Sequence, residues 1–166
     1  MADPTRSLTA IFKRIQDATK QAVAREQMRR LGQFTVDIVV KRTRLGYGVS
    51  AGFGEKSALK KLSEKYIQKR KRFKGLSNTT TPSRSNLTFT GQMLRSVQVI
   101  EAVDGRVRFG PTGNRDGGGP TNAEVASYQE AQGRPFNRVS ELEYQQVLRE
   151  FKREFGDLLN KKGLLK

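Results

Sequence analysis

A β-hairpin centred on Asp104-Gly105 is the feature that most restricts the fold of this chain. Asp-Gly between two β-prone runs favours a two-residue turn, and such a turn fixes the register of its strands. The register pairs Val103 with Arg106, Ala102 with Val107, Glu101 with Arg108, and Ile100 with Phe109. One face of the hairpin is then apolar, and the other carries a Glu101–Arg108 ion pair. The sequence therefore predicts an antiparallel hairpin over residues 97–110.

A long amphipathic helix is predicted at the N-terminus. Asp3-Pro4 is typical of a helix start, with a capping residue followed by proline at the first helical position. Apolar residues then recur at spacings of three and four, at Leu8, Ile11, Ile15, Ala18 and Ala22. This periodicity predicts a helix that reaches at least Leu31. Residues 34–43 are ambiguous, because their valines favour a strand while a continuing helix with a weak point at Gly32 fits as well.

A second, basic helix is predicted between two loops. The glycines of residues 46–54 indicate the first loop, and Ser57 can cap a helix that extends to about Lys74. Lysines one turn apart destabilise an isolated helix, so packing or a bound anion should compensate. Residues 75–86 are rich in Ser, Thr and Asn and are predicted to form the second loop.

The C-terminal part contains two capping boxes. Thr121 with Glu124 predicts a short helix through Ala131, and Ser140 with Glu143 predicts the last helix. That helix carries an apolar seam at Tyr144, Leu148, Phe151, Phe155 and Leu158. The glycine-rich residues 110–120 lack the Gly-Lys-Ser/Thr ending of a phosphate-binding loop and are interpreted as a connection.

Together these elements predict an α+β fold in one domain, residues 1–166. Its expected parts are an N-terminal helical part (4–74), a loop (75–86), and the hairpin with the C-terminal helices (87–166). Residues 87–97 lead into the hairpin through Thr90-Gly91 and a short apolar turn, Met93-Leu94.

Composition excludes several kinds of chemistry. The chain has no Cys and no His, so thiol catalysis, zinc fingers and a Ser-His-Asp site cannot occur. Few catalytic side chains are left, and we expect neither an enzyme nor a bound cofactor or metal. No apolar run approaches the ~20 residues of a membrane helix, and no secretory signal is visible at the N-terminus. We therefore expect a protein made in the cytosol that does not enter a membrane.

Positive charge is concentrated in residues 41–75. The whole chain carries a net charge of +16, and this stretch holds twelve Lys or Arg against two Glu. The candidate contacts to DNA or to an acidic partner are Lys41, Arg42, Arg44, Lys60, Lys61, Lys65, Lys69, Arg70, Lys71, Arg72 and Lys74. A solvated face that keeps the protein soluble is the plainer interpretation. A polyanion, most plausibly nucleic acid, is the alternative, and a lysine-rich face suits phosphate contact without base reading.

Two segments resemble a family of phage proteins. Residues 86–97 (NLTFTGQMLRSV) resemble the L-x-x-T-G-x-L/M-L-x-S-I/V segment of tailed-phage tail-completion and virion-morphogenesis proteins. Residues 128–140 follow with Tyr-Gln-Glu, Gly133-Arg134-Pro135-Phe136 and Ser140, which resemble that family's Y-x-E and G-R-P-F-x-x-x-S segment. The chain departs from the family at residues 137–139, where Asn-Arg-Val replaces the usual Leu-Gly-Leu. The resemblance covers roughly residues 40–155.

The resemblance implies a structural protein of the virion, made in the host cytoplasm and placed at the head–tail junction. Such proteins form rings at the neck or at the top of the tail, around the channel for the double-stranded genome. The implied partners are further copies of the chain, most simply in a hexamer, together with neighbouring neck and tail proteins. The motif residues then have structural roles. Thr90-Gly91 turns the chain into the hairpin, Phe136 packs at the start of the last helix, and Arg134 pairs with an acid or a carbonyl.

The charge of such a ring exceeds what the DNA inside it can neutralise. Six copies would carry 96 excess positive charges, six times the net charge of one chain. One turn of duplex carries only about 20 phosphates. We therefore expect a subset of the cations, on the 56–74 helix and its flanks, to face the lumen, and others to face acidic neighbours. Two alternatives stay open: a sequence-independent nucleic-acid-binding protein, and a tail-assembly factor absent from the mature virion.

Overall fold

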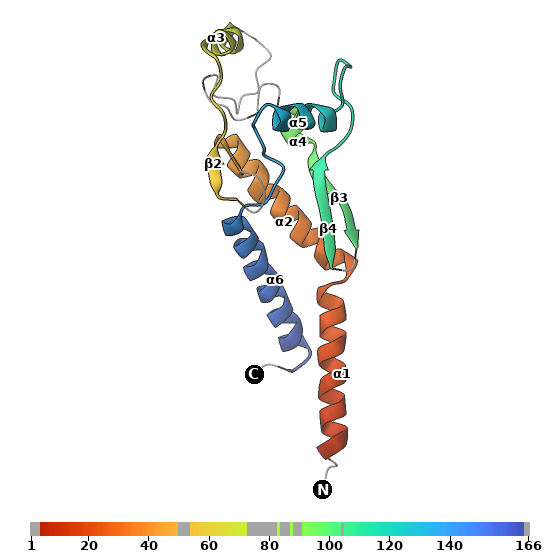
Figure 1. The fold of residues 1–166 in the computed structure, drawn as a ribbon. Coiled ribbons are helices and arrows are strands. Elements are labelled where there is room, and N and C mark those ends of the chain that lie inside the picture. Colours follow the sequence, from red (N-terminus) through yellow and green to blue (C-terminus); the bar gives the residue numbers. More distant parts are fainter. Residues whose placement is uncertain are drawn as a thin grey trace.

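The computed structural model describes residues 4–49, 54–72, 83, 87, 91–103 and 105–164. In this part the chain forms six helices and two two-stranded antiparallel sheets, so the predicted α+β class is confirmed. The helices are α1 (Pro4–Ala22), α2 (Arg25–Arg44), α3 (Glu64–Arg72), α4 (Gln92–Arg95), α5 (Asn122–Ala131) and α6 (Glu141–Lys161). The strands are β1 (Tyr47–Val49), β2 (Lys56–Ala58), β3 (Val97–Val103) and β4 (Arg106–Pro111). Figure 1 shows α2 between the β3–β4 hairpin and α6, with α1 and α3 extending at opposite ends.

Helix α2 resolves the ambiguity of residues 34–43 in favour of a helix. Its buried residues, among them Met28, Leu31, Val36 and Val39, follow the helical period rather than the alternation of a strand. Packing of this face against the hairpin outweighs the strand preference of its valines. Gly32 is the contact point, because a Cβ there would lie 2.7 Å from Val107 Cγ1. Gly32, which the sequence indicates as a weak point of the helix, is therefore the position at which the hairpin approaches the helix backbone.

The predicted N-terminal helix is interrupted before Leu31. Helix α1 ends at Ala22, and Ala24 has an extended backbone (φ −61°, ψ 153°) before α2 begins. The break lies at the tip of the hairpin, where the N–H of Gly105 donates to the carbonyl of Val23 at 3.3 Å. The expectation of one continuous helix was wrong because the break depends on this distant contact rather than on a local glycine or proline. Asp3, the predicted cap, lies outside the described residues.

The hairpin is confirmed, with one change in its register. Val103–Arg106, Ala102–Val107 and Glu101–Arg108 pair as predicted. Phe109, however, faces Val99 instead of Ile100, because an irregularity between Val99 and Glu101 inserts one extra residue. Val99 therefore packs in the core, while Ile100 is 50% exposed. The predicted ion pair is present at 3.5 Å between Arg108 Nη1 and Glu101 Oε2.

A second small sheet occupies the region expected to be a glycine loop. Strand β1 pairs with β2, with Gly48 opposite Ser57. A Cβ on Gly48 would lie 2.2 Å from the carbonyl oxygen of Pro135, to which the neighbouring Val49 N–H donates at 3.1 Å. Only glycine permits this approach of two backbones. The basic helix accordingly starts later than predicted, since Ser57 belongs to β2 and α3 begins at Glu64 after Ser63.

Both capping boxes form as predicted. Thr121 with Glu124 opens α5, which ends at Ala131, and Ser140 with Glu143 opens α6. Helix α5 then stops in a Schellman motif, in which Gly133 has a positive φ and Arg134 N–H donates to the carbonyl of Gln129 at 2.9 Å.

Helix α6 lies against α1 and α2, as an apolar seam would require. Phe151 packs on a cluster formed by Met28, Leu31 and Ala102. Tyr144, predicted as the first residue of the seam, is 43% exposed. A second cluster joins α2, α4, the hairpin and α5 and contains Val36, Met93, Leu94, Val97, Ala126 and Phe136. None of the described helices combines the length and the apolar character needed to cross a bilayer.

Candidate functional site

The structure divides the cationic candidates into exposed and buried residues. Eight are exposed: Lys41, Arg44, Lys60, Lys61, Lys65, Lys69, Lys71 and Arg72. Arg42 and Arg70 are buried, at 4% and 2% relative exposure, and Lys74 lies outside the described residues. Lys41 and Arg44 end α2, Lys60 and Lys61 lie in the extended segment after β2, and the others belong to α3. The cluster that is continuous in sequence is therefore not one surface.

Arg42 corrects the prediction of a DNA or acidic-partner contact. Its guanidinium forms an ion pair with Glu143 and donates to the carbonyls of Phe136 and Arg138. Burial lowers the pKa of Arg42, and the nearby carboxylate of Glu143 opposes this shift. Glu143 also accepts from the Ser140 N–H at 2.9 Å, so one carboxylate serves both the cap of α6 and this arginine. Arg42 therefore joins α2 to the start of α6 and does not face a partner.

Helix α3 displays a stripe of three exposed cations. Lys65, Lys69 and Arg72 are spaced by four and three residues, so they lie on one side of the helix. We call these three residues the α3 stripe; at 1.5 Å per residue it spans about 10 Å. The predicted like-charge penalty is offset in part by position. Glu64 lies in the first turn and four bases lie in the last turn, where each sign suits the helix dipole.

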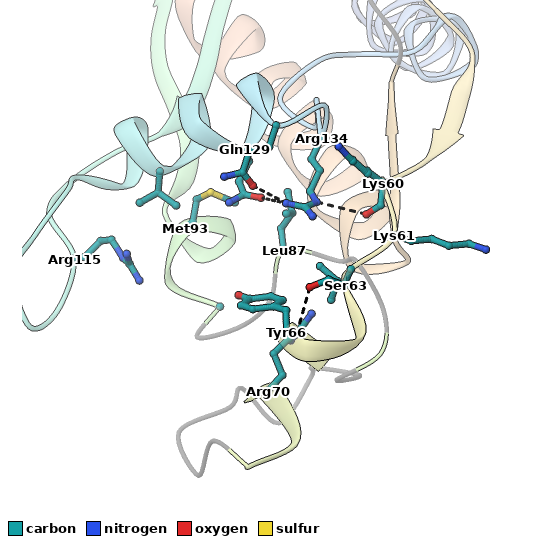
Figure 2. Close-up of a pocket in the computed structure, with 14 residues that line it drawn as sticks. Lys60, Lys61, Ser63, Tyr66, Arg70, Leu87, Met93, Arg115, Gln129 and Arg134 are labelled. Atoms are coloured by element: carbon teal, nitrogen blue, oxygen red, sulfur yellow. Dashed lines mark hydrogen bonds between the residues drawn. The ribbon is translucent and has the colours of Figure 1, made fainter. Parts of the chain in front are cut away.

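The adjacent side of α3 faces a pocket. Arg70 lies there with Tyr66, one turn earlier, and both line a cavity of about 660 Å³. In Figure 2 these two side chains lie across the cavity from Gln129 and Arg134, with Leu87 between them and Met93 beside Gln129. Burial lowers the pKa of Arg70, and Tyr66 opposes that shift. Arg70 thus belongs to a partly open pocket and is removed from the set of exposed contacts.

Two further cations of this pocket were absent from the predicted contacts. Arg115 comes from the glycine-rich connection, and Arg134 comes from the segment between α5 and α6. Arg134 donates to the carbonyl of Lys60 at 3.5 Å and to Gln132 Oε1 at 2.8 Å. Of the two partners that the resemblance implies for Arg134, an acid or a carbonyl, the described contacts include a carbonyl. No local signal marks Arg115 as a pocket residue, because only the tertiary fold brings residues 60–70 and 115 together.

The motif residues within the described part have packing and capping roles. Gly91 adopts a positive φ (74°) directly before α4, and Met93 and Leu94 are buried. Gly133 ends α5, as described above. The segment from Pro135 onward then contacts β1 and Arg42 through its carbonyls, with Phe136 fully buried. Thr90, the remaining motif residue, lies outside the described residues.

The described side chains contain no group of three or more acidic residues placed to hold a metal ion. Comparison with protein families, with curated protein sequences and with solved structures gave no match. The site is therefore interpreted from its own chemistry: an exposed cationic stripe, and beside it a cationic pocket with apolar lining.

Proposed function

We propose that this protein is a structural component of a tailed-phage virion that forms a ring at the head–tail junction, around the DNA channel. The α3 stripe carries this proposal. It places three exposed positive charges on a helix that lies apart from the other described helices (Figure 1). Two of its three residues are lysine, which suits contact with phosphates better than reading of base edges. Contact with DNA of any sequence is the requirement of a genome channel.

The motif segments support the same proposal. Gly91 and Gly133 form turns beside α4 and α5, Phe136 is buried in the core, and Ser140 caps α6, which agrees with the structural roles that the family resemblance implies. The proposed protein is therefore a scaffold that positions a cationic helix, rather than a catalyst.

Exposed apolar side chains support association with other chains. Phe12 is 69% exposed, with Ile11 and Ile15 beside it on α1, and Leu142 on α6 is 72% exposed. Figure 1 shows the first turns of α1 extending beyond the rest of the described chain. Apolar surface of this kind is commonly covered by a neighbouring subunit in an assembly. A ring of several copies would cover it and would bring several α3 stripes to one channel.

Salt-dependent binding to a short DNA duplex tests the contribution of the stripe. Replacing Lys65, Lys69 and Arg72 together by Gln should reduce the slope of log K against log salt by about 2.7 per copy, at three phosphate contacts. The matched control replaces three exposed cations of α6, Arg149, Lys152 and Arg153, and should leave the slope near that of the wild type. An equal reduction of the slope in both variants would contradict a phosphate-binding stripe.

A second candidate function is a sequence-independent nucleic-acid-binding protein that acts outside the virion, and the same α3 stripe favours it. Tight duplex binding by a chain that stays monomeric at all concentrations would support this alternative over the ring. The protein composition of purified virions distinguishes a ring protein from a tail-assembly factor. Mass spectrometry should detect the protein in the particles only if it stays in the mature virion.

A further inference from the structure

The pocket beside α3 combines positive charge with an apolar lining. Its lining includes the apolar side chains Leu62, Leu87, Met93 and Val125. The basic residues of the lining are Lys60, Lys61, Arg70, Arg115 and Arg134, of which Lys61 extends its side chain away from the cavity (Figure 2). None of the described residues that line it is acidic. This chemistry differs from that of the α3 stripe, which offers charge without an apolar surface.

The cations of the pocket stand on opposite walls. Figure 2 shows Arg70 on α3 on one side and Arg134 on the other, with Arg115 at the margin. Arg115 Nε is buried and has no hydrogen-bond partner in the described part of the chain. The neighbouring carboxylate of Asp116 is used elsewhere, since it accepts from Gln92 at 2.7 Å. Like charges across a partly enclosed space repel, so a negatively charged occupant would stabilise this arrangement.

We infer that the pocket binds an acidic peptide segment of another protein, with an apolar side chain seated among Leu62, Met93 and Val125 and carboxylates on the arginines. Arginine binds carboxylate through paired, charge-assisted hydrogen bonds, and the apolar lining gains from covering a leucine-sized group. The inference rests on the proposed function, because it names what a neighbouring virion protein presents at this site. It assigns the α3 stripe to DNA and the pocket to protein.

Nucleic acid fits this pocket less well than a peptide. A duplex presents phosphates on a convex surface and has no apolar side chain to insert. Single strands bind through rows of stacked bases on aromatic side chains. The described lining contains one aromatic residue, Tyr66. A peptide with an apolar side chain between carboxylates suits both the apolar lining and the arginines of the pocket.

A second copy of this chain is also a poor source of the segment. Its clearest candidate is Glu141-Leu142-Glu143, in which Leu142 is exposed. Glu143 is buried against Arg42, so only one carboxylate of that sequence is available. Further along α6, Glu150 is paired with Arg153. The occupant should therefore come from a different, acidic protein.

Binding of a fluorescent peptide to the full-length protein tests the inference. The probe carries one leucine between two pairs of glutamates and is followed by anisotropy. Arg115→Gln should weaken binding about tenfold, because it removes a charge-assisted contact. Arg115→Lys should recover part of that loss. The control Arg149→Gln removes the same charge from the exposed face of α6 and should change affinity by less than about twofold. A probe with serine in place of leucine should also bind more weakly.

Three results would overturn the inference. Equal losses for Arg115→Gln and Arg149→Gln would mean that the peptide is held by overall charge. A serine probe that binds as tightly as the leucine probe would exclude the apolar contact. A duplex whose affinity falls about tenfold in Arg115→Gln would assign the pocket to nucleic acid. If the peptide test fails while the α3 stripe variant still lowers the salt slope of duplex binding, this inference alone is refuted. If the peptide binds as expected and the salt slope does not change, the proposed function is refuted.

Discussion

Arg42 and the α3 stripe belong to one basic stretch of sequence, yet they serve different purposes. Arg42 is buried at the junction of α2 and α6, where its two terminal guanidinium nitrogens bind Glu143 and two backbone carbonyls. The α3 stripe is exposed, and α3 has no extensive packing against any other described element. The junction stabilises the fold, and the stripe is available to a partner. Local charge density therefore does not reveal which cations are functional, because burial and partners decide it.

The largest expected effect comes from breaking the Arg42 junction. Glu143→Ala leaves a buried guanidinium without its carboxylate and should lower the free energy of unfolding by about 3–5 kcal/mol. Urea denaturation measures this change. Glu141→Ala, an exposed carboxylate in the same turn of α6, is the control and should change stability by less than about 1 kcal/mol. A Glu143→Ala protein as stable as this control would show that the junction contributes little.

The next effect contrasts a tightly packed glycine, Gly48, with an unpacked one, Gly156. Gly48→Ala forces a Cβ against the Pro135 carbonyl and should destabilise the protein by about 1–3 kcal/mol. Gly156 lies in α6 with open space around its Cβ position, so Gly156→Ala should stabilise by about 0.5–1 kcal/mol. Thermal denaturation of both variants provides the measurement. Shifts of the same sign would contradict the close approach of β1 to the Pro135 segment.

A smaller effect is expected from the α3 stripe. Replacing Lys65, Lys69 and Arg72 by Gln should change stability by no more than about 0.5 kcal/mol, because these residues are exposed and have no packing to lose. Denaturation of the same triple variant used for duplex binding checks this. A large loss of stability would mean that the stripe belongs to the fold, as Arg42 does, and the comparison between the two regions would fail.

The smallest effect concerns the cap of α5. Hydrogen bonds from the backbone N–H and hydroxyl of Thr121 lower the pKa of Glu124. Its contribution to stability is therefore present above the ordinary carboxyl pKa and is lost as pH falls through the lowered value. Glu124→Gln keeps a capping side chain without the charge and should flatten this part of the pH profile. Denaturation midpoints measured between about pH 7 and about pH 3 test this, and identical slopes in both proteins would contradict it.

Features set by neighbouring residues could be predicted from the sequence. Both capping boxes, the end of α5 and three of the four hairpin pairs form as expected, because each depends on residues within a few positions of one another. The pairing failed at Ile100, where an extra residue enters the strand. That irregularity lets Val99 reach both core clusters, which is a requirement of the packed fold rather than of the hairpin.

Features set by distant residues could not be predicted. The break between α1 and α2 lies where Gly105 N–H donates to Val23, and β1, besides pairing with β2, donates from Val49 N–H to the carbonyl of Pro135. The burial of Arg42 depends on Glu143, about a hundred residues away. The candidate site follows the same rule: the exposed stripe could be anticipated from charge, but Arg115 joins the pocket only through the fold.

Electron microscopy of the protein in its native assembly tests the central claim most directly. We predict a closed ring of several copies in which Lys65, Lys69 and Arg72 face the channel, while Arg42 stays buried within each subunit. The pocket beside α3 should then contact an acidic segment of a neighbouring protein. A channel lined by acidic or neutral residues, with α3 directed outward, would contradict the account.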